Sequence, residues 1–207
     1  MGNQASYNIS PESENINLAN QHLTKLPFTP PLENKAKNLY LSGNKFISLP
    51  ENMKNVLLVD LSKNQLSGSL PLHIAKALAS YPNLKKLNLS SNQLEKFNDA
   101  LKSNQIESLN LVQNRFTEFP EHLITRLPAL ETFSFDCNFL KVFSKLQSEL
   151  IVTLSLSLNC IQSIETSSLH LPQLTSLDLS KNKIKSIPNN FSISFPSLKI
   201  LDLSDNF

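Results

Sequence analysis

One short pattern recurs along almost the whole chain and restricts what it can fold into. Its clearest copies are LKKLNLSSNQL (84–94), IESLNLVQNRF (106–116), LTSLDLSKNKI (174–184) and LKILDLSDNF (198–207), which share the template L-x-x-L-x-L-x-x-N-x-L. Weaker copies are AKNLYLSGNKF (36–46), VLLVDLSKNQL (56–66), LETFSFDCNFL (130–140) and IVTLSLSLNCI (151–161), and INLANQHL (16–23) opens the series. Nine units spaced about 20 to 28 residues apart predict a chain that stacks one structural unit on the next.

The spacing of the apolar positions within the template predicts a short β-strand. The two leucines of L-x-L lie two residues apart, so on a strand both point to one face while the residue between them points to the other. Strands of successive units can then stack in parallel, with template positions one, four, six and eleven filling one continuous core. Such a solenoid presents the alternate strand positions along one side.

A polar residue follows each predicted strand, at template position nine. The first unit has Gln21 at this place, and the others carry an asparagine: Asn44, Asn64, Asn92, Asn114, Asn138, Asn159, Asn182 and Asn206. The chain must turn inward after the strand, and an amide there can bond to backbone groups that the turn would otherwise leave buried and unpaired. We therefore predict that these residues form a structural asparagine spine rather than a catalytic row.

The segments between the templates vary in length and composition. LPLHIAKALASYPNL (70–84) predicts a helix, because Ile74, Ala77 and Leu78 fall on one face of it. PEHLITRLPAL (120–130) predicts a shorter helix with a proline in its first turn, and SIPNNFSISFPSL (186–198) predicts an irregular or 3₁₀ segment. Connections of such variable form are expected on the outer side of a solenoid.

From about residue 14 to its end, the sequence resembles the leucine-rich repeat family. The resemblance implies an α/β solenoid, a horseshoe whose parallel sheet lines the concave side and whose convex side carries short helical or irregular segments. It divides the chain into a polar tail, residues 1–14, and a repeat domain of nine units, residues 15–207. Because the ninth template stops one residue short of its last apolar position, we expect the sequence to be a fragment; a natural stop is the alternative.

Composition restricts the partners and the compartment. The chain has 19 basic and 17 acidic residues and a net charge of +2, so we expect no strong attraction to nucleic acid or to an anionic membrane. Two cysteines are too few for a disulfide framework. Residues 1–15 contain no apolar signal-peptide core, and no apolar run is long enough to span a bilayer. We expect a cytoplasmic protein, free or peripheral on the cytoplasmic side of a membrane.

The first six residues, MGNQAS, match the N-myristoylation motif M-G-x-x-x-[ST], with Gly2 as the acceptor. An ordinary polar tail is the alternative. A single myristoyl chain binds membranes with a constant of only about 10⁴ M⁻¹, and neither a cysteine nor a basic cluster lies near Gly2 to reinforce it. The motif therefore predicts weak, reversible membrane association.

The sequence shows no catalytic or metal-binding pattern. The four histidines share no metal-ligand spacing with one another or with a cysteine. The three glycines form no phosphate-binding loop, and the aspartates of the strands are too dispersed for a paired-carboxylate site. We expect no catalysis, cofactor or metal within this chain.

The outward strand positions form the predicted ligand-binding surface, for which we expect a protein partner. They are small and polar for the most part, and the template alone also accounts for many of them. The candidates for ligand contact on this concave face are Tyr40, Asp60, Lys86, Asn88, Asn110, Ser134, Asp136, Asp178 and Asp202.

Two functions fit these observations. The first is a protein-binding module that acts as a scaffold or recognition domain in intracellular signalling. The second is the N-terminal regulatory part of a larger signalling enzyme, because repeats behind an MGN start resemble those of amoebal proteins that join such repeats to a metal-dependent Ser/Thr phosphatase domain. The catalytic residues would then lie beyond Phe207. An extracellular receptor is disfavoured by the missing signal peptide and cysteine-containing caps.

Overall fold

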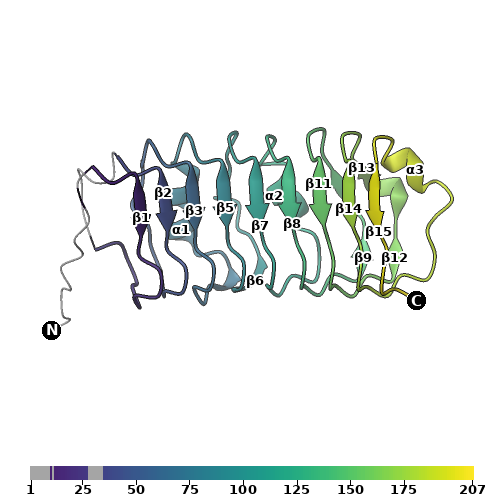
Figure 1. Ribbon diagram of the computed structural model, residues 1–207, viewed down its shortest axis with the longest axis horizontal. Helices are drawn as coiled ribbons and strands as arrows, with labels where there is room; N and C mark the ends of the chain where they lie inside the picture. The colour runs from purple at the N-terminus through teal and green to yellow at the C-terminus, as the bar shows by residue number, and fades with distance from the viewer. Residues whose placement is uncertain (1–9, 11, 28–34) are drawn as a thin grey trace.

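The computed structural model describes residues 10, 12–27 and 35–207. One strand from each of the nine units enters a single parallel sheet (Figure 1). In spatial order the strands are β1 (Asn15–Asn17), β2 (Asn38–Tyr40), β3 (Leu58–Asp60), β5 (Lys86–Asn88), β7 (Ser108–Asn110), β8 (Thr132–Ser134), β11 (Thr153–Ser155), β14 (Ser176–Asp178) and β15 (Ile200–Asp202). This order follows the chain, and the predicted α/β solenoid is confirmed.

Neighbouring strands of this sheet are aligned by template position. The central residues form one row across the sheet: Ile16, Leu39, Val59, Leu87, Leu109, Phe133, Leu154, Leu177 and Leu201. All of them except Leu201 are buried. Because parallel strands lie about 4.8 Å apart, equivalent side chains of successive units stack directly on one another and form one continuous core.

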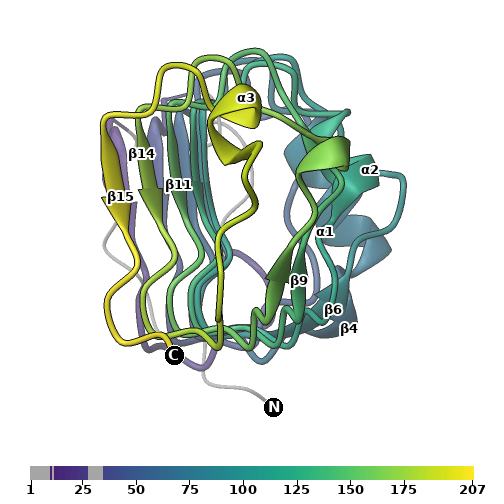
Figure 2. The same cartoon turned by 90° about the vertical axis from the view of Figure 1, so that its right-hand side faces the viewer.

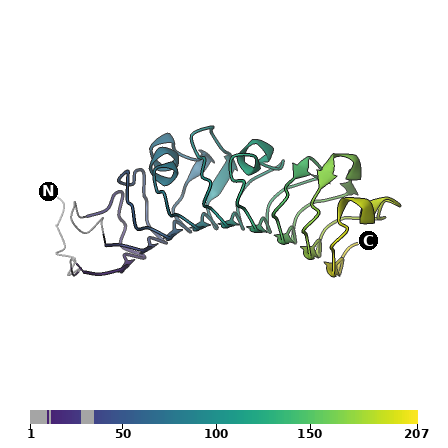
Figure 3. The ribbon, with the colours of Figure 1, turned by 90° about the horizontal axis from the view of Figure 1, so that it is seen from above.

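The return segments form the opposite wall of the solenoid (Figure 2). Among the described residues, this wall contains three helices, one 3₁₀ turn and three two-stranded sheets: α1 (Leu72–Ala79), α2 (Glu121–Ile124), α3 (Phe191–Ser194), η2 (Thr166–Ser168), β4 (Ser67–Ser69) with β6 (Gln93–Lys96), β9 (Val142–Phe143) with β12 (Ser163–Ile164), and β10 (Leu146–Gln147) with β13 (Leu169–His170). Figure 3 shows the large sheet on the inside of a gentle curve and the helices on the outside. The bulkier outer segments lengthen the outer arc, which gives the solenoid its curvature.

Two of the three predictions for the return segments are confirmed. The helix α1 buries Ile74, Ala77 and Leu78 as its periodicity predicted, and α2 begins directly after Pro120. The prediction of an irregular or 3₁₀ segment is wrong for α3, a single α-helical turn that buries an aromatic side chain in the core. No helix of the described residues is long and apolar enough to cross a membrane.

A cluster of phenylalanines strengthens the core beneath α2. Phe133 and Phe135 occupy template positions that other units fill with leucine, and their rings meet at 5.5 Å. Phe135 lies 5.3 Å from both Phe116 and Phe119, and Phe119 lies 5.6 Å from Phe143, all measured between ring centroids. Such stacked and tilted pairs each stabilise a fold by about 0.5–1.5 kcal/mol beyond their buried area. The cluster ties the sheet to the return segments of units five and six.

Candidate functional site

The concave face consists of three rows of outward side chains that the sheet register brings together. The middle row contains template position five, and most of the residues predicted from the sequence lie in it: Tyr40, Asp60, Asn88, Asn110, Ser134, Asp178 and Asp202. Lys86 lies in the row on one side and Asp136 in the row on the other. The nine candidates therefore share one face, but they are spread from β2 to β15 and form no compact pocket.

Five of the candidate residues in the middle row hydrogen-bond to their own turn. Each Oδ1 atom accepts a hydrogen bond of 2.8–3.0 Å from the backbone N–H two residues later, at Asp60, Asn88, Asn110, Asp178 and Asp202. Asp and Asn favour such turns because their short side chains reach the local backbone. One oxygen of each side chain thus shapes the end of its strand. The second carboxylate oxygen, or the amide group, is what remains for a partner.

Asp136 makes a different contact, across to the next strand. The seventh unit has Ser155 in the middle row, where six of the other units have Asp or Asn. The Oδ1 atom of Asp136 accepts hydrogen bonds from the Ser157 N–H and the Ser157 hydroxyl, both at 2.8 Å, and from the Ser155 hydroxyl. Asp136, which belongs to unit six, therefore caps the end of the strand in unit seven, where Ser155 does not cap its own turn. No sequence pattern points to this role, because it depends on the register between strands.

The N-terminal half of the concave face offers a mixed apolar and basic surface. Tyr40 is 36% exposed, and Leu58 on the adjacent strand is half-buried. The register places Leu58 beside Lys86, and Lys86 makes no ion pair with another described residue. Its neighbour Lys85 bonds to Glu107 at 2.7 Å, and this hydrogen bond raises the pKa of Lys85. Lys86 therefore remains available to a partner.

The asparagine spine lies where the strands end, and its members in units two to eight are only 2–7% exposed. Asn114 shows the pattern. Its Oδ1 atom accepts from the Leu94 N–H at 2.9 Å, and its Nδ2 donates to the carbonyls of Leu89 and Leu111 at 3.0 Å. The Leu111 carbonyl also accepts from the asparagine of the next unit. Gln21 is exposed and bonds within its own turn instead.

The residue before each spine position has a left-handed backbone. Its φ lies between 53° and 67° at Asn20, Gly43, Lys63, Ser91, Gln113, Cys137, Leu158, Lys181 and Asp205. A side chain with a Cβ loses about 1–2 kcal/mol in this conformation, so the turn imposes strain in almost every unit. The template gives no hint of it, because residues of very different kinds occupy the position.

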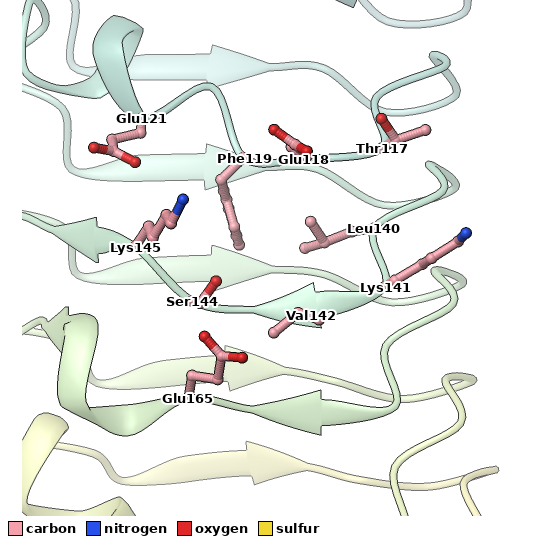
Figure 4. A pocket seen from close by; sticks show the side chains of 10 residues that line it. All are labelled: Thr117, Glu118, Phe119, Glu121, Leu140, Lys141, Val142, Ser144, Lys145 and Glu165. Carbon is pink, nitrogen blue, oxygen red and sulfur yellow. The ribbon is translucent and has the colours of Figure 1, made fainter.

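A cavity of about 540 Å³ opens on the convex side (Figure 4). Its lining comes from the return segments of units five, six and seven: Thr117, Glu118, Phe119, Glu121, Leu140, Lys141, Val142, Ser144, Lys145 and Glu165. A second hollow of about 310 Å³ adjoins it along α2 and shares Glu121 and Lys145 with it. Volumes of about 300–1,000 Å³ are typical of small-molecule sites. Nothing in the sequence had pointed to this place.

The cavity exists because two successive return segments take different forms. Unit five runs through Pro120 into α2, whereas unit six continues as extended chain in β9. The Phe139 N–H donates to the Phe116 carbonyl at 2.8 Å and joins the two segments at their start. Further along the chain, no backbone hydrogen bond of the described residues links residues 117–119 to residues 141–145. A helix is about 10 Å wide and an extended strand about half that. The outer wall therefore steps inward, and the step leaves the cavity.

Within the described ranges, no group of three or more His, Cys, Asp or Glu side chains is arranged to hold a metal ion. Cys137 and Cys160 are free thiols and are half-buried. Partial burial and the charge of Asp136 raise the pKa of the Cys137 thiol, and Lys181 opposes them. A protonated thiol is a weak nucleophile, so the geometry does not favour chemistry at Cys137.

Comparison with known proteins agrees with the geometry. A family model described as Leucine rich repeat matches residues 149–206, and a second, described as Leucine Rich Repeat, matches residues 83–104. A chain of the LRIM1/APL1C complex superposes with a TM-score of 0.70 at 23% identity, over 95% of this chain and 36% of that one. This chain is a leucine-rich repeat solenoid. Internalin C2 from Listeria monocytogenes also resembles the solenoid, with a TM-score of 0.65 at 21% identity, over 92% of this chain and 80% of that one.

Two longer proteins are similar to the solenoid in sequence. Transforming growth factor beta activator LRRC33 of Danio rerio is 30% identical over 201 residues, which are 93% of this chain and 27% of that protein. Protein PAC2 of Saccharomyces cerevisiae is 29% identical over 211 residues, 98% of this chain and 36% of that protein. The solenoid thus spans only about a quarter to a third of the length of these relatives.

Proposed function

We propose that this solenoid is a protein-binding module whose concave sheet is the recognition surface. The observation that carries the proposal is the in-register stacking of nine strands, which holds the outward side chains in three straight rows. Side-chain caps and the asparagine spine fix the end of each strand. A partner therefore meets a preorganised surface, which lowers the entropy lost on binding.

Similar solved structures support the proposal that the partner is a protein. Two of them are themselves complexes, one of LRIM1 with APL1C and one of Toll with Spatzle.

Nine strands spaced about 4.8 Å apart give a face roughly 40 Å long. At a width of about 10 Å it offers about 400 Å², half of the ~800 Å² that each partner buries in an interface of standard size. A partner must therefore also contact the turns beside the sheet.

We place the centre of the contact at Tyr40, Leu58 and Lys86. Aromatic side chains with a polar tip anchor many interfaces, because they bury a large area at low entropic cost. Tyr40 has no turn to cap, unlike the Asp and Asn residues of its row. Lys86 beside Leu58 adds a positive charge that selects a partner with an acidic group next to an apolar one.

Site-specific photocrosslinking tests this proposal. A benzophenone side chain at position 40 should yield a discrete protein adduct in an extract of the source cells, and mass spectrometry would identify the partner. Leu72 on α1 is 49% exposed on the convex side, so the same probe at position 72 is the matched control. Adding Lys86→Glu to the protein that carries the probe at position 40 should reduce the adduct. Equal adducts at both positions, or none at position 40, would contradict recognition by the concave face.

The role in intracellular signalling remains part of the proposal, as does the second function, the regulatory part of a larger signalling enzyme. The relatives that the chain matches are much longer than the chain itself, which leaves room for a further domain in the complete gene product. A metal-dependent Ser/Thr phosphatase domain is the candidate. Two experiments decide between the two functions: sequencing the transcript, and assaying the complete product with a phosphoserine peptide and Mn²⁺. Release of phosphate would support the regulatory part of an enzyme, and its absence would support the binding module.

Attachment of a myristoyl group at Gly2 completes the proposal and would place the protein at the cytoplasmic side of a membrane. Gly2 lies outside the described residues. Metabolic labelling with an alkyne myristate analogue should label the wild-type protein and leave Gly2→Ala unlabelled. Labelling that persists in the variant would exclude this glycine as the acceptor.

A further inference from the structure

The cavity beside α2 has an apolar floor that the core holds rigid. The ring of Phe119 stacks on Phe135 with centroids 5.3 Å apart and planes inclined by 20°, and it also contacts Phe143 at 5.6 Å. Val142, half-buried, and Leu140, buried, complete the apolar lining. Because Phe119 is fixed from behind, its remaining surface can accept an apolar group without rearrangement.

Charged side chains surround this floor. Glu121 of α2 and Glu165, which follows β12, approach from opposite sides, and Glu118, Lys141 and Lys145 complete the charged lining (Figure 4). None of the five forms an ion pair with another described residue. Three carboxylates against two ammonium groups leave an excess of one negative charge. The field in the cavity therefore favours a cationic occupant.

The side chain of Lys145 indicates where a cation can lie. Its ammonium group is directed into the space between Glu121 and Phe119 (Figure 4). The backbone of Lys145 is held separately, with a φ of 56° and its N–H donating to the Ser168 hydroxyl at 2.9 Å. The exposed, flexible side chain can therefore swing into solvent while the backbone stays in place. The ammonium group of a ligand can then enter the cavity on the side of Glu121 without meeting the positive charge of Lys145.

We propose that this cavity binds a small amphipathic cation, with its ammonium or guanidinium group between Glu121 and Glu165 and its aromatic or aliphatic body on Phe119. The quadrupole of a phenylalanine ring attracts a cation as well as an apolar group. An anion would meet the excess of carboxylates, and a neutral molecule would gain the apolar contact alone. The cavity lies in the wall opposite the concave sheet, so its occupant does not compete with a protein partner there.

Three probes of similar shape test the charge selectivity. 2-Phenylethylamine, titrated into ¹⁵N-labelled protein, should shift the amide resonances of Phe119, Val142 and Ser144, with a Kd on the order of 1 mM for so small a molecule. Neutral 2-phenylethanol and anionic 3-phenylpropionate should bind at least about fivefold more weakly. The proposal is overturned if either binds as tightly as the amine, or if the amine shifts resonances only elsewhere.

Single substitutions then test the placement of the cation. Glu121→Gln and Glu165→Gln should each weaken amine binding about threefold to fivefold and leave 2-phenylethanol binding unchanged. Lys145→Gln should strengthen amine binding, because it removes the competing ammonium group. Glu51→Gln alters an exposed carboxylate outside the cavity and is the matched control. These four side chains are exposed, and far-UV circular dichroism verifies that each variant is folded. Wild-type affinity in both cavity Glu variants would refute the proposed site.

Discussion

Replacing Asn114 by leucine tests how the strand ends are held. The two carbonyls that its Nδ2 bonds, at Leu89 and Leu111, each accept from a second asparagine of the spine, so both keep one partner after the substitution. The N–H of Leu94 loses the acceptor that lies 2.9 Å away. A buried N–H without a partner costs about 1–3 kcal/mol, and the two lost carbonyl bonds add about 1 kcal/mol together. We expect Asn114→Leu to lower the free energy of unfolding by about 2–4 kcal/mol.

Urea-induced unfolding followed by far-UV circular dichroism measures this loss as a shift of the midpoint at constant slope. Asn104 is exposed, and Asn104→Leu is the matched control. It should stay within about 0.5 kcal/mol of the wild type. An unchanged midpoint for Asn114→Leu, or a loss no larger than that of the control, would refute the assignment of the spine as the hydrogen-bond anchor of the turns.

The other structural features lead to further predictions. Leu158→Gly should raise the free energy of unfolding by about 0.5–1 kcal/mol, because relief of left-handed strain exceeds the greater chain entropy of glycine; lower stability in urea would contradict this. Asp136→Ala should lower the free energy of unfolding by about 1–2 kcal/mol, because the Ser157 N–H loses its hydrogen-bond acceptor. Asp136→Asn keeps an oxygen that can accept this bond and should lower the free energy of unfolding less; an equal decrease in both variants would count against the cap. Hydrogen bonds from the Ser204 hydroxyl and N–H hold the pKa of Asp202 below its ordinary value. A depressed folded pKa stabilises the fold above the unfolded pKa, and this contribution is lost as the pH falls through the folded pKa. An NMR titration should show a lower pKa for Asp202 in the wild type than in Ser204→Ala; identical values would contradict the assignment.

The sequence predicted the strands and the core because the template ties each position to one geometry. Apolar residues two apart, followed by an asparagine, leave one way to stack nine units, and the register follows. The helix α1 was predictable for a similar reason, since Ile74, Ala77 and Leu78 repeat at helical spacing. The concave face could be located in the same way, because it consists of the positions between the apolar ones.

Other features could not be read from the sequence because they depend on contacts between units. The cap that Asp136 provides involves residues 19 and 21 positions away, and only the strand register brings them together. The helical turn of α3 is too short for periodicity to reveal, and packing of Phe191 against Phe195, at 4.7 Å, accompanies it. The convex cavity arises from a mismatch between neighbouring return segments, and no pattern within either segment predicts a mismatch.

Each spine asparagine donates to the equivalent backbone carbonyl of the preceding unit, and this common joint makes the units interchangeable building blocks. Every unit joins its neighbours through the same backbone atoms, whatever the length of the return segment behind it. A unit can thus be duplicated, deleted or enlarged on its outer side while the joints between units stay the same. The recognition surface can grow or shrink in steps of one strand, about 4.8 Å, with its rows of side chains still in line.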